Sequence, residues 1–276
     1  VAEKGDDGVT RGVRDLEASE LGESGALVEV AWSSVNYKDG LATIAKGQVA
    51  RISPLIPGID LAGTLEDGTE VLAHGYDLGV SHHGGYSQYA RVPAEWLVAL
   101  PRGMSLWEAM VFGTAGFTAG IGIVRMEENR LRPANGPVIV SGATGGVGSI
   151  AVSALSKLGY HVVALTGKES EADWLKKLGA KEILLRQSLN LEKIKPLDKA
   201  TWAGAVDNLG GPVLSWIAST MKDNGTIASI GLAQSAEVHT WVMPFILRGA
   251  CLLGINSGES VPPEVRANVW RRLAGD

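Results

Sequence analysis

The sequence predicts an α/β protein in which a β-rich first part is followed by a parallel sheet of alternating strands and helices. Residues 1–100 contain short apolar runs broken by Gly, Pro and Asp clusters, which is typical of β structure. From Pro137 onward, strand-like apolar runs alternate with segments of helical spacing, as in βαβ units. A glycine-rich loop follows the first of these runs directly. The length of 276 residues leaves room for two domains.

In the first part, the clearest predicted element is a strand at Leu27–Trp32, whose side chains alternate between two faces. Shorter strands are expected at Val71–Ala73 and Trp96–Val98, because turn-forming residues bound each apolar run. Ser105-x-x-Glu108 has the form of a capping box, in which each side chain satisfies the other residue's backbone N–H. It predicts a helix that begins directly after Ser105.

In the second part, residues 137–140 predict a buried strand, and Val147–Leu158 has the apolar spacing of a helix that a glycine ends. His161–Leu165 predicts the next strand. Ser170-x-x-Asp173 has the form of a second helix cap and predicts a further helix. The remaining expected elements are strands at 182–185, 204–206 and 226–230 and a last helix that Pro262–Pro263 starts and that runs through Trp270.

Composition limits the classes of function. The net charge is −5 with no long basic run, which argues against nucleic acid as the main partner. No continuous apolar stretch reaches about 18 residues, so no membrane span is expected, and the polar Val1–Asp7 does not resemble a signal peptide. The single cysteine, Cys251, excludes an internal disulfide and favours a reducing, cytoplasmic compartment. Its apolar neighbours favour a place in the core.

The glycine-rich loop Ser141–Gly148 lies between a predicted strand and a predicted helix. It reads Ala143-x-Gly145-x-x-Gly148, the fingerprint of a dinucleotide site with alanine in place of the first glycine. Gly145 would let the backbone approach a pyrophosphate, and Gly148 would let helix and strand pack closely. A tight turn without a ligand is the alternative, but the βαβ context favours a cofactor. The expected phosphate contacts, at a helix N-terminus, are Gly145, Gly146, Val147, Gly148 and Ser149.

The end of the second predicted strand indicates which dinucleotide binds. An acidic residue there would bind the ribose 2′-OH of NAD, but Thr166 stands at about that position. Lys168 is close enough to contact a 2′-phosphate, whereas Glu169 is expected to point away. A solvated Lys and a surface Arg are the alternative reading. The sequence favours NADPH, and the expected contacts are Thr166, Gly167, Lys168, Ser170 and Arg186, the last stacking on adenine or pairing with the phosphate.

No zinc site is expected. A catalytic zinc of the alcohol dehydrogenase type needs Cys and His ligands, and a structural zinc usually needs four cysteines, which one cysteine cannot supply. The adjacent His82 and His83 have no further ligand at a suitable spacing. We therefore expect them in an exposed loop.

Five segments are distinctive in combination: Trp32–Asp39, Pro57–Asp60, Gly113–Ala119, Trp202–Asp207 and Val242–Arg248. Together they resemble the medium-chain dehydrogenase/reductase superfamily, and most of all its zinc-free quinone oxidoreductase and acrylyl-CoA reductase branch. The resemblance implies a GroES-like catalytic domain at 1–112, to which 259–276 returns, and a Rossmann NADPH-binding domain at 113–258.

The resemblance implies NADPH-dependent reduction of an activated carbon–carbon double bond, with acrylyl-CoA or a similar enoyl thioester as the acceptor, by hydride transfer without zinc. Reduction of a quinone is the alternative enzyme reading, and a non-catalytic NADPH-binding redox sensor or structural protein is the alternative of another class. A homodimer is also expected, because Cys251–Ile255 resembles the apolar edge strand through which relatives pair.

A hydride transfer to an enoyl thioester needs a donor for the developing oxyanion and a source of a proton. Tyr37 is the candidate donor, with Asn36 beside it, although a core tyrosine is an equally good reading. Asp60 is expected to position this loop or to cap a turn. Asn208 and Leu232 are expected contacts at carboxyl ends of strands, and Thr114 and Thr118 are expected contacts near the entry to the Rossmann domain, unless they only cap helices. Ile246 resembles a position of the branch that contacts the nicotinamide.

Overall fold

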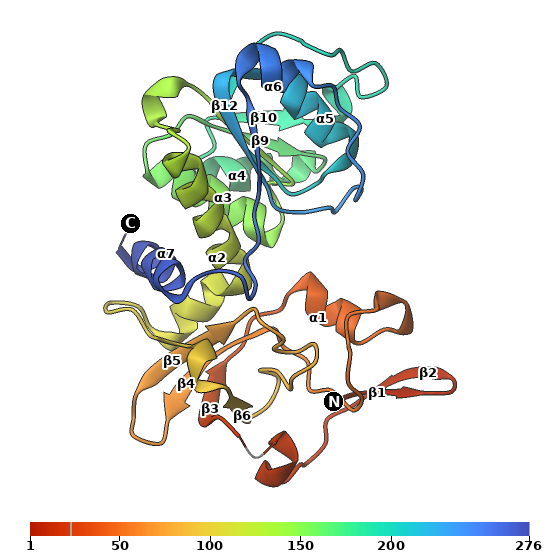
Figure 1. The fold of residues 1–276 in the computed structure, drawn as a ribbon, viewed down its shortest axis with the longest axis vertical. Helices are drawn as coiled ribbons and strands as arrows, with labels where there is room; N and C mark the ends of the chain where they lie inside the picture. The colour runs from red at the N-terminus through yellow and green to blue at the C-terminus, as the bar shows by residue number, and fades with distance from the viewer. Residues whose placement is uncertain (23, 276) are drawn as a thin grey trace. The chain divides into compact units, whose positions relative to one another are not determined.

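The computed structural model describes residues 1–22 and 24–275, which form two compact units. The first unit comprises Val1–Phe117 and Ser257–Gly275, and the second comprises Thr118–Asn256. The chain thus leaves the first unit at Phe117 and returns to it at Ser257 (Figure 1). The boundaries predicted from the sequence were residues 112 and 259.

The first unit is built on a five-stranded antiparallel sheet in the order β6-β3-β4-β5-β7. Its core is formed by one face of this sheet, where Val28, Leu61 and Val92 are buried. The strands expected around residues 27–32, 71–73 and 96–98 are confirmed as β3, β5 and β7. The bounds are β1 Ala2–Gly5, β2 Gly8–Arg11, β3 Ala26–Trp32, α1 Tyr37–Ala42, β4 Asp60–Leu65, β5 Glu70–His74, β6 Tyr89–Val92, β7 Leu97–Ala99 and α7 Pro263–Gly275, with 3₁₀ turns at η1 Ala18–Leu21, η2 Ala45–Gly47 and η3 Ala94–Trp96.

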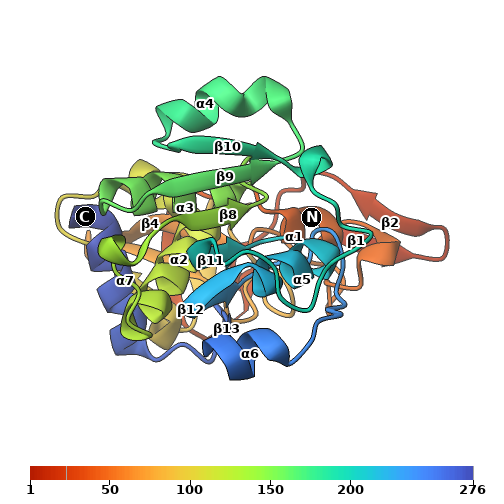
Figure 2. The ribbon, with the colours of Figure 1, turned by 90° about the horizontal axis from the view of Figure 1, so that it is seen from above.

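The second unit is a six-stranded parallel sheet in the order β10-β9-β8-β11-β12-β13, drawn side by side in Figure 2. In order of appearance this is 3-2-1-4-5-6, the order of a doubly wound Rossmann sheet, which the family resemblance implies. The bounds are β8 Val138–Ser141, α3 Gly146–Lys157, β9 Val162–Thr166, α4 Ala172–Lys177, β10 Glu182–Leu185, β11 Trp202–Asp207, α5 Gly211–Ser219, β12 Met221–Ser229, α6 Met243–Arg248 and β13 Cys251–Gly254, with 3₁₀ turns at η4 Pro133–Asn135, η5 Glu169–Glu171 and η6 Arg186–Ser188.

Helices cover both faces of this parallel sheet. Ala151 and Leu155 of α3 pack with Val140 in one core, and Val213 and Ile217 of α5 belong to a second core on the opposite face. Because both faces are covered, the strands read as continuous apolar runs instead of alternating ones.

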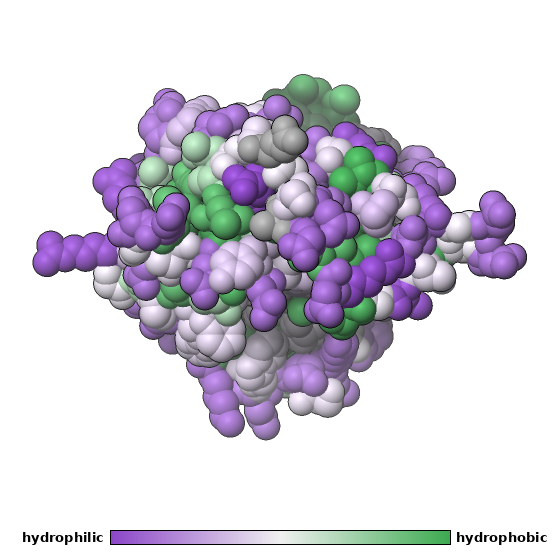
Figure 3. Space-filling view, turned by 90° about the horizontal axis from the view of Figure 1, so that it is seen from below, coloured by the Kyte–Doolittle hydropathy of each residue, from purple (hydrophilic) through white to green (hydrophobic). Residues whose placement is uncertain are grey.

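The long helix α2, Leu106–Glu128, begins at the predicted capping box: Glu108 donates its N–H to Ser105 Oγ (3.2 Å), and Ser105 donates to Glu108 Oε2 (2.8 Å). Among the described residues, α2 is the one helix long and apolar enough to cross a membrane by length and composition. However, 67% of its apolar window is buried, as expected of a core helix. The face drawn in Figure 3 is mainly hydrophilic, with hydrophobic residues in separate patches.

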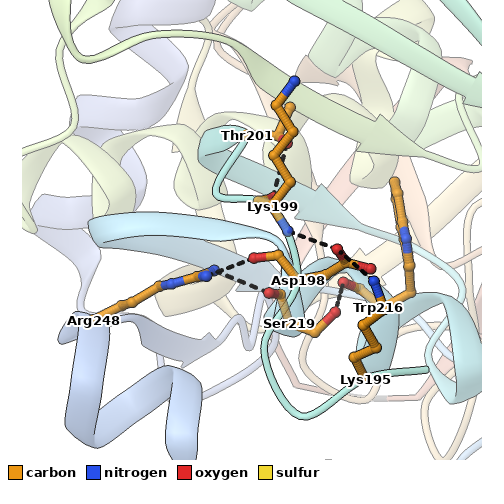
Figure 4. Close-up of polar contacts among 7 residues, drawn as sticks. All are labelled: Lys195, Asp198, Lys199, Thr201, Trp216, Ser219 and Arg248. Carbon is orange, nitrogen blue, oxygen red and sulfur yellow. Dashed lines mark hydrogen bonds and ion pairs between the residues drawn. The ribbon is translucent and has the colours of Figure 1, made fainter.

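Arg248 fixes helix α6 to its neighbours through the backbone. Its guanidinium donates to the carbonyl oxygens of Asp198 (2.5 Å) and Ser219 (3.0 Å), as Figure 4 shows. It also donates to the carbonyl oxygen of Met221 (2.9 Å), at the start of β12. Lys195 in turn pairs with the Asp198 carboxylate at 3.2 Å. These contacts hold α6, and with it Ile246, in a defined place on the second unit.

Two sequence predictions about these elements are wrong. Ser170 does not cap α4, because residues 169–171 form η5 and the helix begins at Ala172 without a side-chain cap. Cys251 is half-buried on β13 and is not a core residue, because β13 is the last strand of the sheet.

The position of β13 supports the expected homodimer. It pairs with β12 on one side, and among residues 1–22 and 24–275 no strand pairs with its other side. Leu252 is partly exposed there. We expect light scattering to give twice the chain mass at micromolar concentration, because an uncovered apolar edge favours pairing with a second copy. Leu252→Lys should shift the equilibrium towards the monomer; a monomeric wild-type protein contradicts the prediction.

A buried polar cluster anchors α7 to the first unit. Arg266 is 2% exposed and donates to the carbonyl oxygens of His74 (3.1 Å) and Gly258 (2.8 Å), while its guanidinium lies over the ring of Tyr76. Trp270 Nε1 donates to His74 Nε2 (2.8 Å), so this imidazole nitrogen acts as an acceptor. Burial and the neighbouring Arg266 charge hold the pKa of His74 well below its usual range.

This cluster predicts a loss of stability in mild acid. The folded-state pKa of His74 lies below the unfolded value, so the unfolded state binds the proton more readily. Stability should therefore fall as pH drops below about 6.5, with a slope of up to about 1.4 kcal/mol per pH unit. His74→Gln should flatten the pH dependence of the melting temperature. It should not abolish it, since burial also lowers the pKa of His83; an unchanged slope contradicts the prediction.

Candidate functional site

The loop between β8 and α3 has the geometry of a phosphate-binding turn. Gly142 has a left-handed φ of 59°, and a Cβ on Gly148 would come within 2.3 Å of the Gly142 carbonyl oxygen. Close packing thus requires glycine at 148. A Cβ on Gly145 would lie 3.3 Å from the same carbonyl oxygen, which is a tight contact but a less severe one. The first N–H groups of α3, which include those of Gly146 and Val147, have no acceptor within the helix. They make this helix end suited to an anion.

Beside this loop is a cavity of about 280 Å³ that brings together most of the residues predicted to select the cofactor. Because Leu185 pairs with Thr166 in the parallel sheet, Arg186 emerges at the same edge as residues 166–168. Its guanidinium lies 3.7 Å from the place of a Cβ on Gly167. The residues that line the cavity are Gly142, Thr144, Leu165, Thr166, Gly167, Lys168, Arg186 and Leu209.

Two nearby residues lie outside this lining. Ser170, predicted as a contact, and Glu169, expected to point away, are both exposed in η5. The backbone N–H of Lys168 is held by Thr166 Oγ1 at 3.0 Å. The cavity therefore has two cations and no carboxylate among its described lining residues.

The carboxyl end of β11 contributes an unsatisfied acceptor. Asn208 donates from its backbone to Ser141 Oγ (2.9 Å) and from Nδ2 to the Ser141 carbonyl (2.7 Å). Its Oδ1 is buried without a hydrogen-bond partner, and its Cβ is 3.3 Å from the place of a Cβ on Gly142. The preceding Asp207 is fully buried, and burial raises its pKa. A ligand that donates a hydrogen bond would satisfy Asn208 Oδ1.

The other predicted contacts of the second unit do not line this cavity. Leu232 and Ile246 are 68% and 70% exposed, on the segment after β12 and on α6 respectively. Thr118 lies within α2 and is 7% exposed. The backbone on either side of Leu232 is hydrogen-bonded to the end of β11, because Gly231 donates to the Asp207 carbonyl (3.2 Å) and Ala233 to the Asn208 carbonyl (3.2 Å). Leu232 thus follows the strand ends directly, although its side chain does not line the cavity.

In the first unit, Asp60 is the centre of a hydrogen-bond network. Its carboxylate accepts the N–H (2.9 Å) and hydroxyl (2.6 Å) of Ser34, the Nδ2 of Asn36 (2.9 Å), and the N–H (2.9 Å) and hydroxyl (3.0 Å) of Thr114. Asp60 is fully buried at the start of β4. It thereby ties the segment after β3 to helix α2.

Helix α2 is interrupted where it meets this carboxylate. Gly113 has φ 49° and ψ −154°, and a Cβ there would lie 2.5 Å from Ser34 Oγ and 2.9 Å from Asp60 Oδ2. Thr114 then opens the second segment of the helix with its N–H pointing at Asp60. A carboxylate at a helix N-terminus is stabilised by the helix dipole. Asp60 therefore acts as a cap supplied from elsewhere in the chain.

The network changes the interpretation of Asn36 and Tyr37. Asn36 Nδ2 donates to Ser34 Oγ (3.0 Å) and to Asp60 Oδ2 (2.9 Å), so this amide holds the turn in place. Tyr37 begins α1 and is 86% exposed. The reading of Tyr37 as a core residue is therefore wrong, and its hydroxyl is accessible.

Sequence reasoning missed a second buried carboxylate, Asp39. It is 2% exposed and accepts the N–H groups of Asn36 (2.7 Å) and Ile59 (2.8 Å) and the hydroxyl of Tyr86 (3.1 Å). Burial raises its pKa. The capping pattern Asn36-x-x-Asp39 was a signal in the sequence. Tyr86 has no such signal, since its partner is 47 residues away.

No group of three or more His, Cys, Asp or Glu side chains able to hold a metal occurs in residues 1–22 and 24–275. His83 accepts the N–H of Ile56 at Nδ1 (3.1 Å), and His82 Nδ1 lies 2.8 Å from the His83 carbonyl oxygen. Both are half-buried, so the expectation of an exposed loop is wrong.

Comparison with known families confirms the expected fold. Residues 22–102 match the alcohol dehydrogenase GroES-like domain, and residues 146–275 match the family described as zinc-binding dehydrogenase. The two units are therefore a GroES-like antiparallel domain and a Rossmann domain.

Proteins similar over nearly the whole chain carry reductase names. "Putative quinone oxidoreductase YhfP" of Bacillus subtilis is 50% identical over 100% of this chain and 86% of that protein. Acrylyl-CoA reductase AcuI of Ruegeria pomeroyi is 43% identical over 96% of this chain and 82% of that protein.

Solved structures of similar proteins contain dinucleotides. The crystal structure of Bacillus subtilis yhfP with NAD bound has a TM-score of 0.97 and 49% identity, and it covers 99% of this chain and 85% of that one. The yhdH oxidoreductase of Salmonella enterica in complex with NADP has a TM-score of 0.95 and 46% identity, covering 100% and 86%. Both oxidised cofactors thus occur among similar proteins.

Proposed function

Since this chain belongs to the quinone oxidoreductase and acrylyl-CoA reductase branch of the medium-chain dehydrogenase/reductase superfamily, we propose that it reduces an activated carbon–carbon double bond with NADPH. The acceptor is an enoyl thioester, with acrylyl-CoA as the first candidate. The observation that carries the cofactor choice is the cavity lined by Thr166, Lys168 and Arg186, which has cations where an NAD-specific site has a carboxylate.

The second unit fits NADPH in three respects. The helix end at Gly145–Gly148 suits the pyrophosphate, and a Cβ on Gly148 would push α3 away from the loop. Lys168 and Arg186 suit the 2′-phosphate. The orphaned Asn208 Oδ1 is an acceptor for a ribose hydroxyl. Thr114, Thr118, Leu232 and Ile246 stay proposals as nicotinamide-side contacts.

NADPH supplies a hydride to the β-carbon of the thioester, and a proton is added at the α-carbon. Charge develops on the thioester oxygen between these events, so a hydrogen-bond donor is needed. The exposed hydroxyl of Tyr37 is the candidate donor. Asn36 and Asp60 hold the turn that carries it. We propose that these residues act without zinc.

Tyr37→Phe should lower kcat by about tenfold or more, with little change in the dissociation constant of NADPH. The reason is that the hydroxyl acts on charge that exists only in the transition state. Steady-state kinetics together with fluorescence titration of NADPH separate the two effects. An unchanged kcat would remove Tyr37 from the mechanism.

The acceptor assignment is tested by following oxidation of NADPH by its absorbance. The rate is measured with acrylyl-CoA, with a simple quinone and without an acceptor. Zinc is tested separately: elemental analysis measures the metal content of the protein, and the assays are repeated with a chelator. We expect fast turnover with acrylyl-CoA that the chelator does not reduce. Faster turnover with the quinone would favour the alternative suggested by the name of the 50% identical relative. Loss of a bound zinc together with activity would refute the zinc-free proposal.

A further inference from the structure

The turn from Ser34 to Tyr37 is held by two buried carboxylates that take different parts of it. Asp60 accepts hydrogen bonds from the side chains of Ser34 and Asn36. Asp39 accepts the backbone N–H of Asn36 at 2.7 Å. Asn36 is therefore fixed at its backbone and at its amide, and the following Tyr37 inherits that position.

Tyr86 adds a contact from a distant part of the chain. Its hydroxyl lies 3.1 Å from Asp39 Oδ2 and 3.2 Å from the Ser34 carbonyl oxygen, so both possible acceptors belong to the turn or hold it. One proton serves one of them at a time. Tyr86 thus contacts the turn on the side that Asp39 occupies.

The position of Tyr86 is itself fixed by close packing. Its backbone N–H donates to the Pro57 carbonyl (3.0 Å), and the N–H of Gly85 donates to the Gly58 carbonyl (2.9 Å). A Cβ on Gly58, which has φ 105°, would lie 2.8 Å from Tyr86 Cδ1. The ring therefore packs on the backbone that precedes β4, while Tyr86 as a whole is 38% exposed.

We propose that Tyr86 is a positioning residue for Tyr37: its hydroxyl holds the Asp39 carboxylate and the Ser34–Tyr37 turn in the arrangement that presents the Tyr37 hydroxyl to the acceptor. This proposal rests on the proposed function for the role of Tyr37. The hydroxyl of Tyr86 remains protonated, because burial and the neighbouring Asp39 and Asp60 raise its pKa. It therefore serves as a donor throughout the working pH range.

The main test is Tyr86→Phe, with Tyr89→Phe as the matched control. Tyr89 is exposed on β6, and its hydroxyl makes no hydrogen bond to residues 1–22 or 24–275. Tyr86→Phe should lower kcat about tenfold with an unchanged KM for NADPH, and the control should leave both unchanged. In a Tyr37→Phe background, Tyr86→Phe should have less than a twofold effect, because the two residues act as one unit. Equal effects in both backgrounds would refute the proposal.

The pH profile gives a readout that a purely structural role would not move. The Tyr86 hydroxyl lowers the pKa of Asp39, which burial and Asp60 raise. Without the hydroxyl, the pKa of Asp39 should rise. A protonated Asp39 is a weaker acceptor for Asn36 and Ile59, so the acid limb of kcat should move to higher pH in Tyr86→Phe. An unmoved limb counts against the proposal.

Hydrogen exchange separates this proposal from the proposed function, because it needs no turnover. The amides of Asn36 and Ile59 donate to Asp39 and should exchange about tenfold faster in Tyr86→Phe than in wild type or Tyr89→Phe. If the wild type turns over no acceptor but these amides respond, the proposed function fails and the positioning of the turn stands. If the wild type is active and the amides do not respond, the role of Tyr86 is refuted.

Discussion

Replacing both Lys168 and Arg186 with alanine is expected to remove most of the preference for NADPH over NADH, a change of roughly a hundredfold in relative affinity. The 2′-phosphate is the only chemical difference between the two cofactors. Both side chains line the cavity beside Thr166, and Arg186 lies over Gly167. A charge-assisted hydrogen bond contributes on the order of 1.5–3 kcal/mol, and about 1.4 kcal/mol corresponds to a factor of ten.

Each single variant should raise the dissociation constant of NADPH and leave that of NADH nearly unchanged, as measured by fluorescence titration. The effect should shrink at high salt, because Lys168 and Arg186 are exposed. Lys181→Ala is the matched control, since Lys181 is exposed between α4 and β10 and does not line the cavity. Equal affinities of the wild type for NADH and NADPH would contradict the prediction and point to Glu169 as a ribose ligand.

Much of the fold was predictable because its signals are local. The Gly145-x-x-Gly148 pattern, the apolar run at 137–140 and the capping box at Ser105 each depend on residues a few positions apart. The parallel order of strands followed from their alternation with helices. The prediction that Ser170 caps the next helix also relied on a local pattern, and it is wrong because residues 169–171 form η5 and the helix begins at Ala172.

The polar network of the first unit was less predictable, because its members are distant in sequence. Asp60 contacts residues 26 and 54 positions away, so no spacing rule indicates that it caps α2. The contacts of the Asn36 amide with Ser34 and Asp60 likewise join residues that no short sequence pattern connects. Exposure of Tyr37 likewise depends on tertiary packing, which separated the two readings that the sequence left open.

Asp60→Ala is expected to lower the free energy of unfolding by roughly 3–5 kcal/mol. Five hydrogen bonds end on this buried carboxylate, and its removal takes this acceptor away from donors of Ser34, Asn36 and Thr114. A buried donor without a partner costs about 1–3 kcal/mol. The N-terminus of the second segment of α2 also loses its negative charge. Urea unfolding followed by circular dichroism measures the loss.

Asp60→Asn separates the contribution of the hydrogen bonds from that of the negative charge at the helix N-terminus. The amide keeps the size of the side chain and one acceptor oxygen, so its cost should be smaller, about 2 kcal/mol. Asp7→Asn, in the exposed turn between β1 and β2, should change stability by less than about 0.5 kcal/mol. Because the same network holds the turn that precedes Tyr37, the asparagine variant should lose kcat more than its stability loss alone explains under conditions where it is fully folded. A variant with native stability and native kcat would show that Asp60 neither caps α2 nor positions the turn.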